Sequence, residues 1–149
     1  MSADYLCPTL FVTGTDTGIG KTTIASALAR HFTLSGLRVG VMKPIETGVI
    51  DPNQPGPDAK LLRWAAQADD PDEAIAPYRF KLPAAPAQAV EETGASIDIA
   101  HLKNLAVTLS KDKDLLLIEG AGGLMVPIQG GYLIADLIRD LQLPLRLVN

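Results

Sequence analysis

Residues 14–23 read GTDTGIGKTT, and this stretch decides the fold. It nearly matches the phosphate-binding pattern G-x-x-x-x-G-K-[ST], in which one glycine stands five places before the next. Thr15 occupies that place here, and the glycine stands one residue earlier, at Gly14. The stretch is therefore either a phosphate loop with one extra residue or a chance run of small polar residues, and the flanking sequence decides between them.

The residues on both sides of this stretch favour a phosphate loop. Residues 9–13 (TLFVT) are typical of a short buried strand that leads into the loop. After it, a helix is predicted from Lys21 to about Ser35, with Gly36 marking its end. Its apolar positions at helical spacing are Ile24, Ala27, Leu28 and Phe32. Backbone N–H groups of such a loop and the helix N-terminus together bind an anion.

Three further apolar runs lack the alternation of a half-exposed strand and predict buried strands. They are residues 39–43, 115–118 and 145–148. Helical patterns separate them along the chain. Continuous apolar strands alternating with helices indicate a mostly parallel sheet with helices on both faces, which is an α/β fold.

The segments between these strands have the pattern of helices or the composition of loops. Asp58 is a candidate N-cap for a helix that carries Leu61, Leu62, Ala65 and Ala66. Two more helices are predicted from Ile99 to Leu109 and near Leu133 to Leu141. Residues 51–57 (DPNQPGP) predict a loop, and residues 77–95, with four prolines or glycines among alanines, predict mostly irregular structure.

Length and composition bound the class of protein. A chain of 149 residues predicts a single domain, residues 1–149. The net charge of −4 gives no sign of a nucleic-acid or membrane-surface partner. No apolar run approaches the ~20 residues of a spanning helix, and the N-terminus lacks the pattern of a signal peptide. Cys7 is the only cysteine, which fits a reducing compartment, so we expect a cytoplasmic protein.

Chemically informative residues follow three of the predicted strands, at residues 14–23, 43–48 and 119–123. Ligands of parallel α/β sheets bind beyond the carboxyl ends of the strands. In the loop, Lys21 is placed to reach the outer phosphates and the Thr22 hydroxyl to bind Mg²⁺. Lys43 projects a second ammonium group over the same edge. Glu119, directly before a glycine-rich run, is a candidate acid for the magnesium ion.

Taken together, these motifs resemble those of the dethiobiotin synthetases. GTDTGIGKT, KPIETG (43–48) and EGAGG (119–123) occur in the order of that family, and the resemblance spans about residues 9–149. It implies a P-loop NTPase-like sheet and a phosphate loop of the longer form. Chains of the family continue beyond the fourth strand with a part that contacts the adenine base. The resemblance therefore implies that this sequence lacks the family's C-terminal part.

The resemblance also implies a reaction. A dethiobiotin synthetase carries out the ATP-dependent carboxylation and ring closure of 7,8-diaminopelargonate with CO2 (or bicarbonate), a step of biotin biosynthesis. A carbamate and a carbamic–phosphoric anhydride are its intermediates, ATP is the co-substrate and Mg²⁺ the cofactor. The family resemblance further suggests a homodimer.

Site residues are implied by the same resemblance. Lys21 and Lys43 would be catalytic, and Thr22, Asp58 and Glu119 would hold the metal. Thr17, Lys43 and Thr47 would bind the substrate, whose apolar chain would lie against residues 84–86. The implied nucleotide-binding residues are Gly18, Ile19, Gly20, Lys21, Thr22, Thr23, Asp58, Glu119, Gly120, Ala121 and Gly122.

Three alternatives belong to other classes. A switch ATPase of the partitioning or nitrogenase-iron-protein kind carries an early loop lysine that reaches across a dimer, and Asp16 occupies that place here. An amidotransferase-type ligase such as cobyrinate synthase needs a glutaminase domain with a catalytic cysteine. A non-enzymatic binding module would show no ATP consumption that depends on the diamine.

Overall fold

A four-stranded parallel sheet forms the centre of the molecule. The computed structural model describes residues 7–142 and 145–148. The strands lie in the order β2-β5-β1-β8, and all three pairings are parallel. Their bounds are Thr9–Gly14 (β1), Val39–Met42 (β2), Leu115–Gly123 (β5) and Leu145–Val148 (β8). The four predicted strands and the parallel α/β fold are thereby confirmed.

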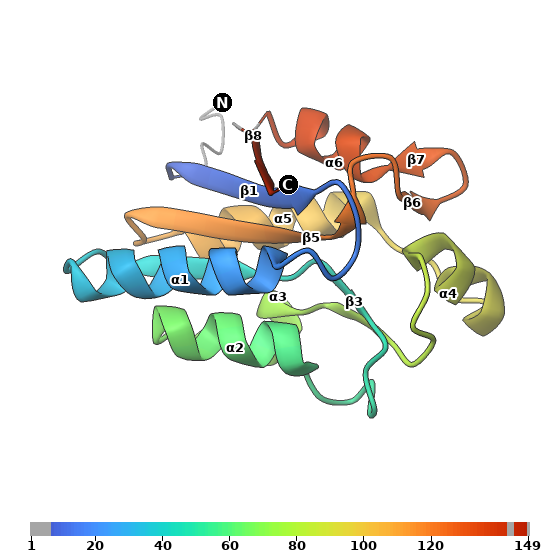
Figure 1. Cartoon of the computed structure of the whole chain (residues 1–149), viewed down its shortest axis with the longest axis horizontal. Coiled ribbons are helices and arrows are strands. Elements are labelled where there is room, and N and C mark those ends of the chain that lie inside the picture. The colour runs from blue at the N-terminus through green and yellow to red at the C-terminus, as the bar shows by residue number, and fades with distance from the viewer. Residues whose placement is uncertain (1–6, 143–144, 149) are drawn as a thin grey trace.

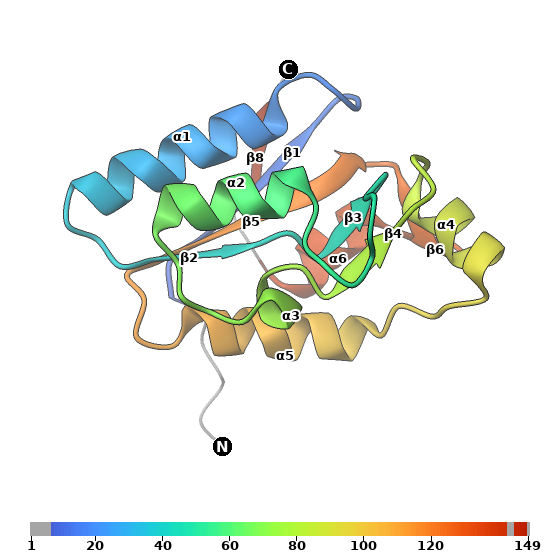
Figure 2. The same ribbon diagram turned by 90° about the horizontal axis from the view of Figure 1, so that it is seen from below.

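Helices cover both faces of this sheet. Figures 1 and 2 show α1 (Lys21–Leu34) and α2 (Pro57–Ala66) on one face and α5 (Ile99–Ser110) on the other. The helix α6 (Ile134–Asp140) contacts β5, and the short α3 (Asp72–Ile75) contacts β2 and α5. Between the layers, the central strands contribute side chains with no exposed surface, such as Phe11 and Ile118. Burial of such apolar surface is the main stabilising contribution to a fold of this kind.

The prediction of mostly irregular structure for residues 77–95 is wrong. This segment contains β4 (Tyr78–Phe80), which pairs in parallel with β3 (Ile45–Thr47), and the helix α4 (Pro86–Thr93). Pro86 is the first residue of α4, where a missing backbone N–H breaks no helical hydrogen bond, and Gly94 ends the helix at φ 67°. The proline and the glycine therefore delimit a helix here.

The buried positions of α1 differ from those predicted, whereas in α2 three of the four predicted positions, Leu62, Ala65 and Ala66, are buried. In α1, Ile24 and Ala27 are exposed, while Ala25 and Ala29 are buried. In α2, Leu61 is exposed although Leu62 is fully buried. Small residues allow a helix to approach its neighbour closely, and α1 packs along α2. The size of an apolar side chain alone therefore misidentified the packed face of α1.

Asp58 does not cap α2, contrary to the prediction. The N-cap is Gly56, and Asp58 is the second residue of the helix. The predicted end of the third strand at Glu119 is also wrong, because β5 continues to Gly123. Its last residue pairs with Gly14 of β1, so the glycine-rich run stays in the sheet after a local irregularity.

A two-stranded antiparallel sheet, β6 (Pro127–Gln129) and β7 (Tyr132–Leu133), follows β5 and contacts α4 and α6. No helix within the described part of the chain is long and apolar enough to cross a membrane.

Candidate active site

The loop between β1 and α1 has the backbone of an anion site. Gly18 and Gly20 adopt left-handed conformations, with φ 75° and 97°, which glycine reaches without steric cost. Gly20 is the N-cap of α1 and makes no side-chain capping bond, and the first turn contains no acidic residue. Backbone N–H groups at such a helix start carry partial positive charge and favour an anion.

Lys21 lies folded against this loop. Its Nζ donates to the backbone carbonyl of Asp16 at 2.6 Å, and the Asp16 carboxylate accepts from the Thr17 N–H at 2.7 Å. Burial lowers the pKa of Lys21, and the nearby charge of Lys43 lowers it further. An anion between the two lysines would relieve both effects, so the loop favours a phosphate group in this place.

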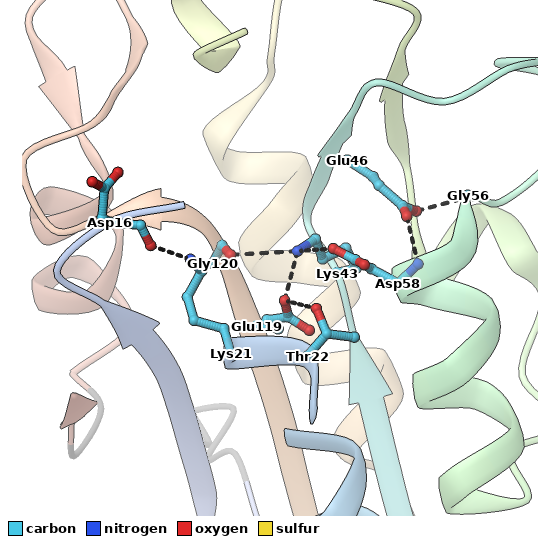
Figure 3. A network of polar contacts seen from close by, with 9 residues as sticks. All are labelled: Asp16, Lys21, Thr22, Lys43, Glu46, Gly56, Asp58, Glu119 and Gly120. Carbon is cyan, nitrogen blue, oxygen red and sulfur yellow. Dashed lines mark hydrogen bonds and ion pairs between the residues drawn. The ribbon is translucent and has the colours of Figure 1, made fainter. Parts of the chain in front are cut away.

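Lys43 follows β2 and lies between two carboxylates (Figure 3). Its Nζ is 2.8 Å from Glu119 Oε1 and 2.9 Å from Asp58 Oδ2, and only 4% of the residue is exposed. Burial alone lowers the pKa of Lys43, but the two carboxylates outweigh it and the pKa is raised. The side chain is therefore a fixed positive charge at the carboxyl edge of the sheet.

Glu119 joins this lysine to the loop. Its Oε1 also accepts from the Thr22 hydroxyl at 2.7 Å, and 1% of the residue is exposed. Its Oε2 is buried without a hydrogen-bond partner among the described residues. A buried carboxylate oxygen of this kind requires a partner, such as water or a cation.

The donor set fits Mg²⁺ bound together with phosphate. Magnesium is commonly held by one or two carboxylates, a Ser or Thr hydroxyl and phosphate oxygens. Thr22, Glu119 and Asp58 supply one hydroxyl and two carboxylates around Lys43. Within the described residues no group of three or more His, Cys, Asp or Glu could hold a metal ion.

Two cavities meet at this site. The first has a volume of about 370 Å³ and is lined by Thr17, Gly18, Gly20, Lys21, Thr22, Thr23, Lys43, Asp58, Glu119 and Gly122. The second, of about 240 Å³, is lined by Thr17, Pro83, Ala84, Ala85, Pro86, Ala121, Gly122 and Val126. Because Thr17 and Gly122 line both, the cavities adjoin. The cavity at the loop thus opens beside a space lined mainly by apolar side chains.

Comparison with known proteins assigns the family. The family described as AAA domain matches residues 8–149, nearly the whole chain. The chain belongs to the AAA domain family.

Curated relatives are named ATP-dependent dethiobiotin synthetase BioD. This member of the AAA domain family is 42% identical to the proteins of that name from Thermodesulfovibrio yellowstonii and Anaeromyxobacter sp. strain K. The alignments cover 93% of this chain and 62% and 61% of those proteins. The protein of Methanocaldococcus jannaschii is 40% identical, over 90% of this chain and 62% of its own. The resemblance to dethiobiotin synthetases is confirmed, and the chain spans about three fifths of the length of these relatives.

Most residues that the sequence predicted for the site line the first cavity, but four do not. These four are Gly120, Ala121, Ile19 and Thr47, and all lie within the residues that the structure describes. The Gly120 carbonyl lies 3.5 Å from Lys43 Nζ, and Ala121 lines the second cavity. Ile19 and Thr47 line neither cavity. The proposed contact of Thr47 with the substrate therefore gains no support from these cavities.

Glu46 is the buried charge that sequence reasoning missed. It lies in β3 and accepts backbone N–H groups from Gly56 at 3.0 Å and Asp58 at 2.8 Å. Only 2% of the residue is exposed, and burial raises the pKa of its carboxyl. The sequence offered one signal for Glu46, namely a charged residue between Ile45 and Thr47, directly after a buried strand. A carboxylate that is buried there needs hydrogen-bond partners.

Proposed function

We propose that this chain, in the protein to which it belongs, carries out the ATP-dependent conversion of 7,8-diaminopelargonate and CO2 to dethiobiotin. One observation carries the proposal. The cavity with the phosphate loop and the Lys43–Glu119 pair adjoins a mainly apolar cavity through Thr17 and Gly122. A site of that shape suits a phosphoryl donor beside a substrate with an apolar chain. The names of the relatives agree with it.

The phosphate loop would hold ATP. The N–H groups from Gly18 to Thr23 and the start of α1 would surround the phosphates, and Lys21 would leave the Asp16 carbonyl to reach them. Thr22, Asp58 and Glu119 would hold Mg²⁺, which neutralises phosphate charge when it is bound. Residues 119–122 would lie beside the nucleotide.

The proposed reaction has three steps. One amine of the diamine adds to CO2 and loses a proton, which gives a carbamate. A carbamate oxygen attacks the γ-phosphorus of ATP, so that ADP leaves and a carbamic–phosphoric anhydride forms. The second amine then attacks the carbamoyl carbon, loses a proton and expels phosphate, which closes the ureido ring. Each step develops or moves negative charge on oxygen atoms.

Lys43 would stabilise these charges from a fixed position. Phosphoryl transfer depends mainly on positioning and on electrostatic stabilisation of the transferred group. With Lys21, Lys43 would place positive charge on both sides of the transferring group, while Thr17 and Thr47 would donate hydrogen bonds to the carbamate or the diamine. The apolar chain would lie against residues 84–86 in the second cavity.

The family resemblance adds an assembly and a compartment to this proposal. We propose a homodimer, and a reaction in the reducing cytoplasm, which the single cysteine fits. The switch-ATPase alternative has less support, because Asp16, of opposite charge, stands at the place of the early loop lysine of that class.

The test is product formation by the purified protein. Incubation with the diamine, bicarbonate and Mg-ATP should give dethiobiotin, detected by mass spectrometry. Lys21→Ala should remove the product and weaken ATP binding at least about tenfold, because a direct phosphate contact is lost. Lys111→Ala, at an exposed lysine outside the site, is the matched control and should retain both. Product formation at the unmutated rate by Lys21→Ala would contradict the proposal.

A further inference from the structure

The start of α2 is held from outside the helix. Its N-cap is Gly56, which has no side chain to accept a backbone N–H, and Pro57 at the first helical position has no N–H. The N–H groups of Gly56 and Asp58 both donate to the Glu46 carboxylate, ten and twelve residues earlier in the chain. Glu46 therefore does for α2 what a capping side chain does in other helices.

The fit between Glu46 and this helix start is close. A Cβ atom added at Gly56 would lie 2.4 Å from Glu46 Oε1 and 2.5 Å from a methyl group of Val49. Only glycine allows the backbone to approach the carboxylate to this distance. The carboxylate and the helix start are thus fixed to one another.

Glu46 is linked to both members of the Lys43–Asp58 ion pair, to Lys43 through the chain and to Asp58 through a hydrogen bond. Lys43 precedes Glu46 by three residues, at the step from β2 into β3. Asp58 donates its backbone N–H to Glu46 while its side chain reaches Lys43 Nζ at 2.9 Å. Figure 3 shows the chain of contacts from Gly56 through Glu46 and Asp58 to Lys43 and Glu119.

We propose that Glu46 is a positioning residue for the phosphoryl-transfer site, and that it acts through Asp58. Its carboxylate fixes the first turn of α2, and this places the Asp58 side chain against Lys43 and beside the space for Mg-ATP. Glu46 itself does not line the phosphate cavity. The inference rests on the proposed function, and it assigns a task to a residue that lines neither cavity.

The geometry requires a carboxylate in particular. Two separate N–H groups donate to its two oxygens, Oε1 and Oε2. Glutamine has the same shape but one of its two polar atoms is a donor, so one backbone N–H would face an NH2 group. Glu46→Gln therefore removes half of the cap with almost no change in volume.

A double-mutant cycle tests this inference. We would measure turnover and Mg-dependent ATP affinity for the unmutated protein, Glu46→Gln, Asp58→Asn and the double variant. Glu46→Gln should lower turnover or Mg-ATP affinity at least about tenfold when Asp58 is present, and at most about twofold in the Asp58→Asn background. Glu91→Gln, at an exposed glutamate of α4, is the control for loss of one negative charge and should change neither quantity.

Other outcomes overturn the inference. Equal losses in both backgrounds would mean that Glu46 acts without Asp58, and a loss below twofold would mean that it positions nothing. Thermal unfolding identifies a variant that does not fold; Glu46→Asp, which keeps the charge, then replaces Glu46→Gln in the cycle. If the unmutated protein binds Mg-ATP but forms no dethiobiotin, the proposed function is wrong but the inference about Glu46 is not yet contradicted. The ATP affinities of the four proteins in the cycle then still test whether Glu46 acts through Asp58.

Discussion

A buried ammonium group is stable only with its counter-charges. Lys43 has two, Asp58 and Glu119, and its charge would otherwise be removed from water without compensation. The two carboxylates therefore offset the cost of burying the lysine before any ligand binds. Removal of Lys43 leaves both carboxylates without an ion-pair partner, whereas removal of either carboxylate leaves Lys43 paired with the other.

We predict that Lys43→Ala lowers the free energy of unfolding by about 3–5 kcal/mol, because Glu119 becomes a buried charge that keeps its Thr22 hydrogen bond but has no ion-pair partner. Urea-induced unfolding measures this change. Addition of Glu119→Gln to that variant should recover part of the loss, since a buried neutral amide is less destabilising than an unpaired carboxylate. If Lys43→Ala unfolds at the same urea concentration as the unmutated protein, the ion pair contributes nothing to stability.

Among single residues, those placed directly after a strand are predictable from the sequence, and those that bridge separate elements are not. Lys21, Thr22, Lys43 and Glu119 were all predicted, because each follows a recognisable strand or lies in the loop after one. Glu46 depends on N–H groups ten and twelve residues away across a loop. No local pattern encodes that contact, because it exists only once α2 has docked.

The segment leading into α4 shapes the second cavity. Residues 83–86 line the second cavity, and Ala85 is the N-cap of the helix. These side chains are small, which leaves space beside Thr17 and Gly122. A larger side chain in this segment would therefore fill part of the second cavity, where we propose that the diamine binds.

We predict that Ala84→Phe raises the KM for 7,8-diaminopelargonate at least about tenfold and leaves the ATP affinity within about twofold. The phenyl ring adds volume to a cavity of about 240 Å³ that is separate from the phosphates, and overfilled sites lose binding. Steady-state kinetics and calorimetry measure the two quantities. Gln88→Phe, at an exposed position of α4 that does not line the cavity, is the control. If ATP binding and diamine binding were weakened equally, the diamine would not bind specifically in the second cavity.

Elements marked by a continuous apolar run or by helical spacing were predicted well, and elements too short to show either pattern were not. The strands β1, β2, β5 and β8 and the helices α1, α5 and α6 carry apolar runs or helical spacing. β3, β4 and β6 have three residues each and β7 two, which is too short for a period to show. α4 is not predicted, because proline and glycine are typical of loops as well as of helix ends, and here Pro86 and Gly94 delimit a helix.

Across the whole molecule, the site collects residues that are distant in the chain. Thr22 and Glu119 are 97 residues apart and Lys43 and Glu119 are 76 apart, yet each pair is hydrogen bonded. The parallel sheet brings them together, because β5 lies between β1 and β2 and all three end at one edge. The unfolded chain cannot assemble this site.

We predict that Mg-ATP stabilises the folded protein. A ligand that binds only the native state at about one hundred times its Kd adds ~2.7 kcal/mol, which raises the melting temperature of a chain of this size by about 5–10 °C. Differential scanning fluorimetry measures the shift. Lys21→Ala should show little or none of it, and a full shift in that variant would show that the nucleotide binds away from the loop.

The two adjoining cavities have different origins in the architecture. The phosphate loop, Lys43 and Glu119 lie in or directly after strands of the central sheet. The second cavity shares Thr17 of the loop and Ala121 and Gly122 of β5, but its other lining residues, 83–86 and Val126, belong to none of the strands of that sheet. In evolutionary terms, selection can exchange the peripheral segments and so change the acceptor molecule. The phosphoryl-donor half, whose geometry is inherited with the sheet itself, stays as it is.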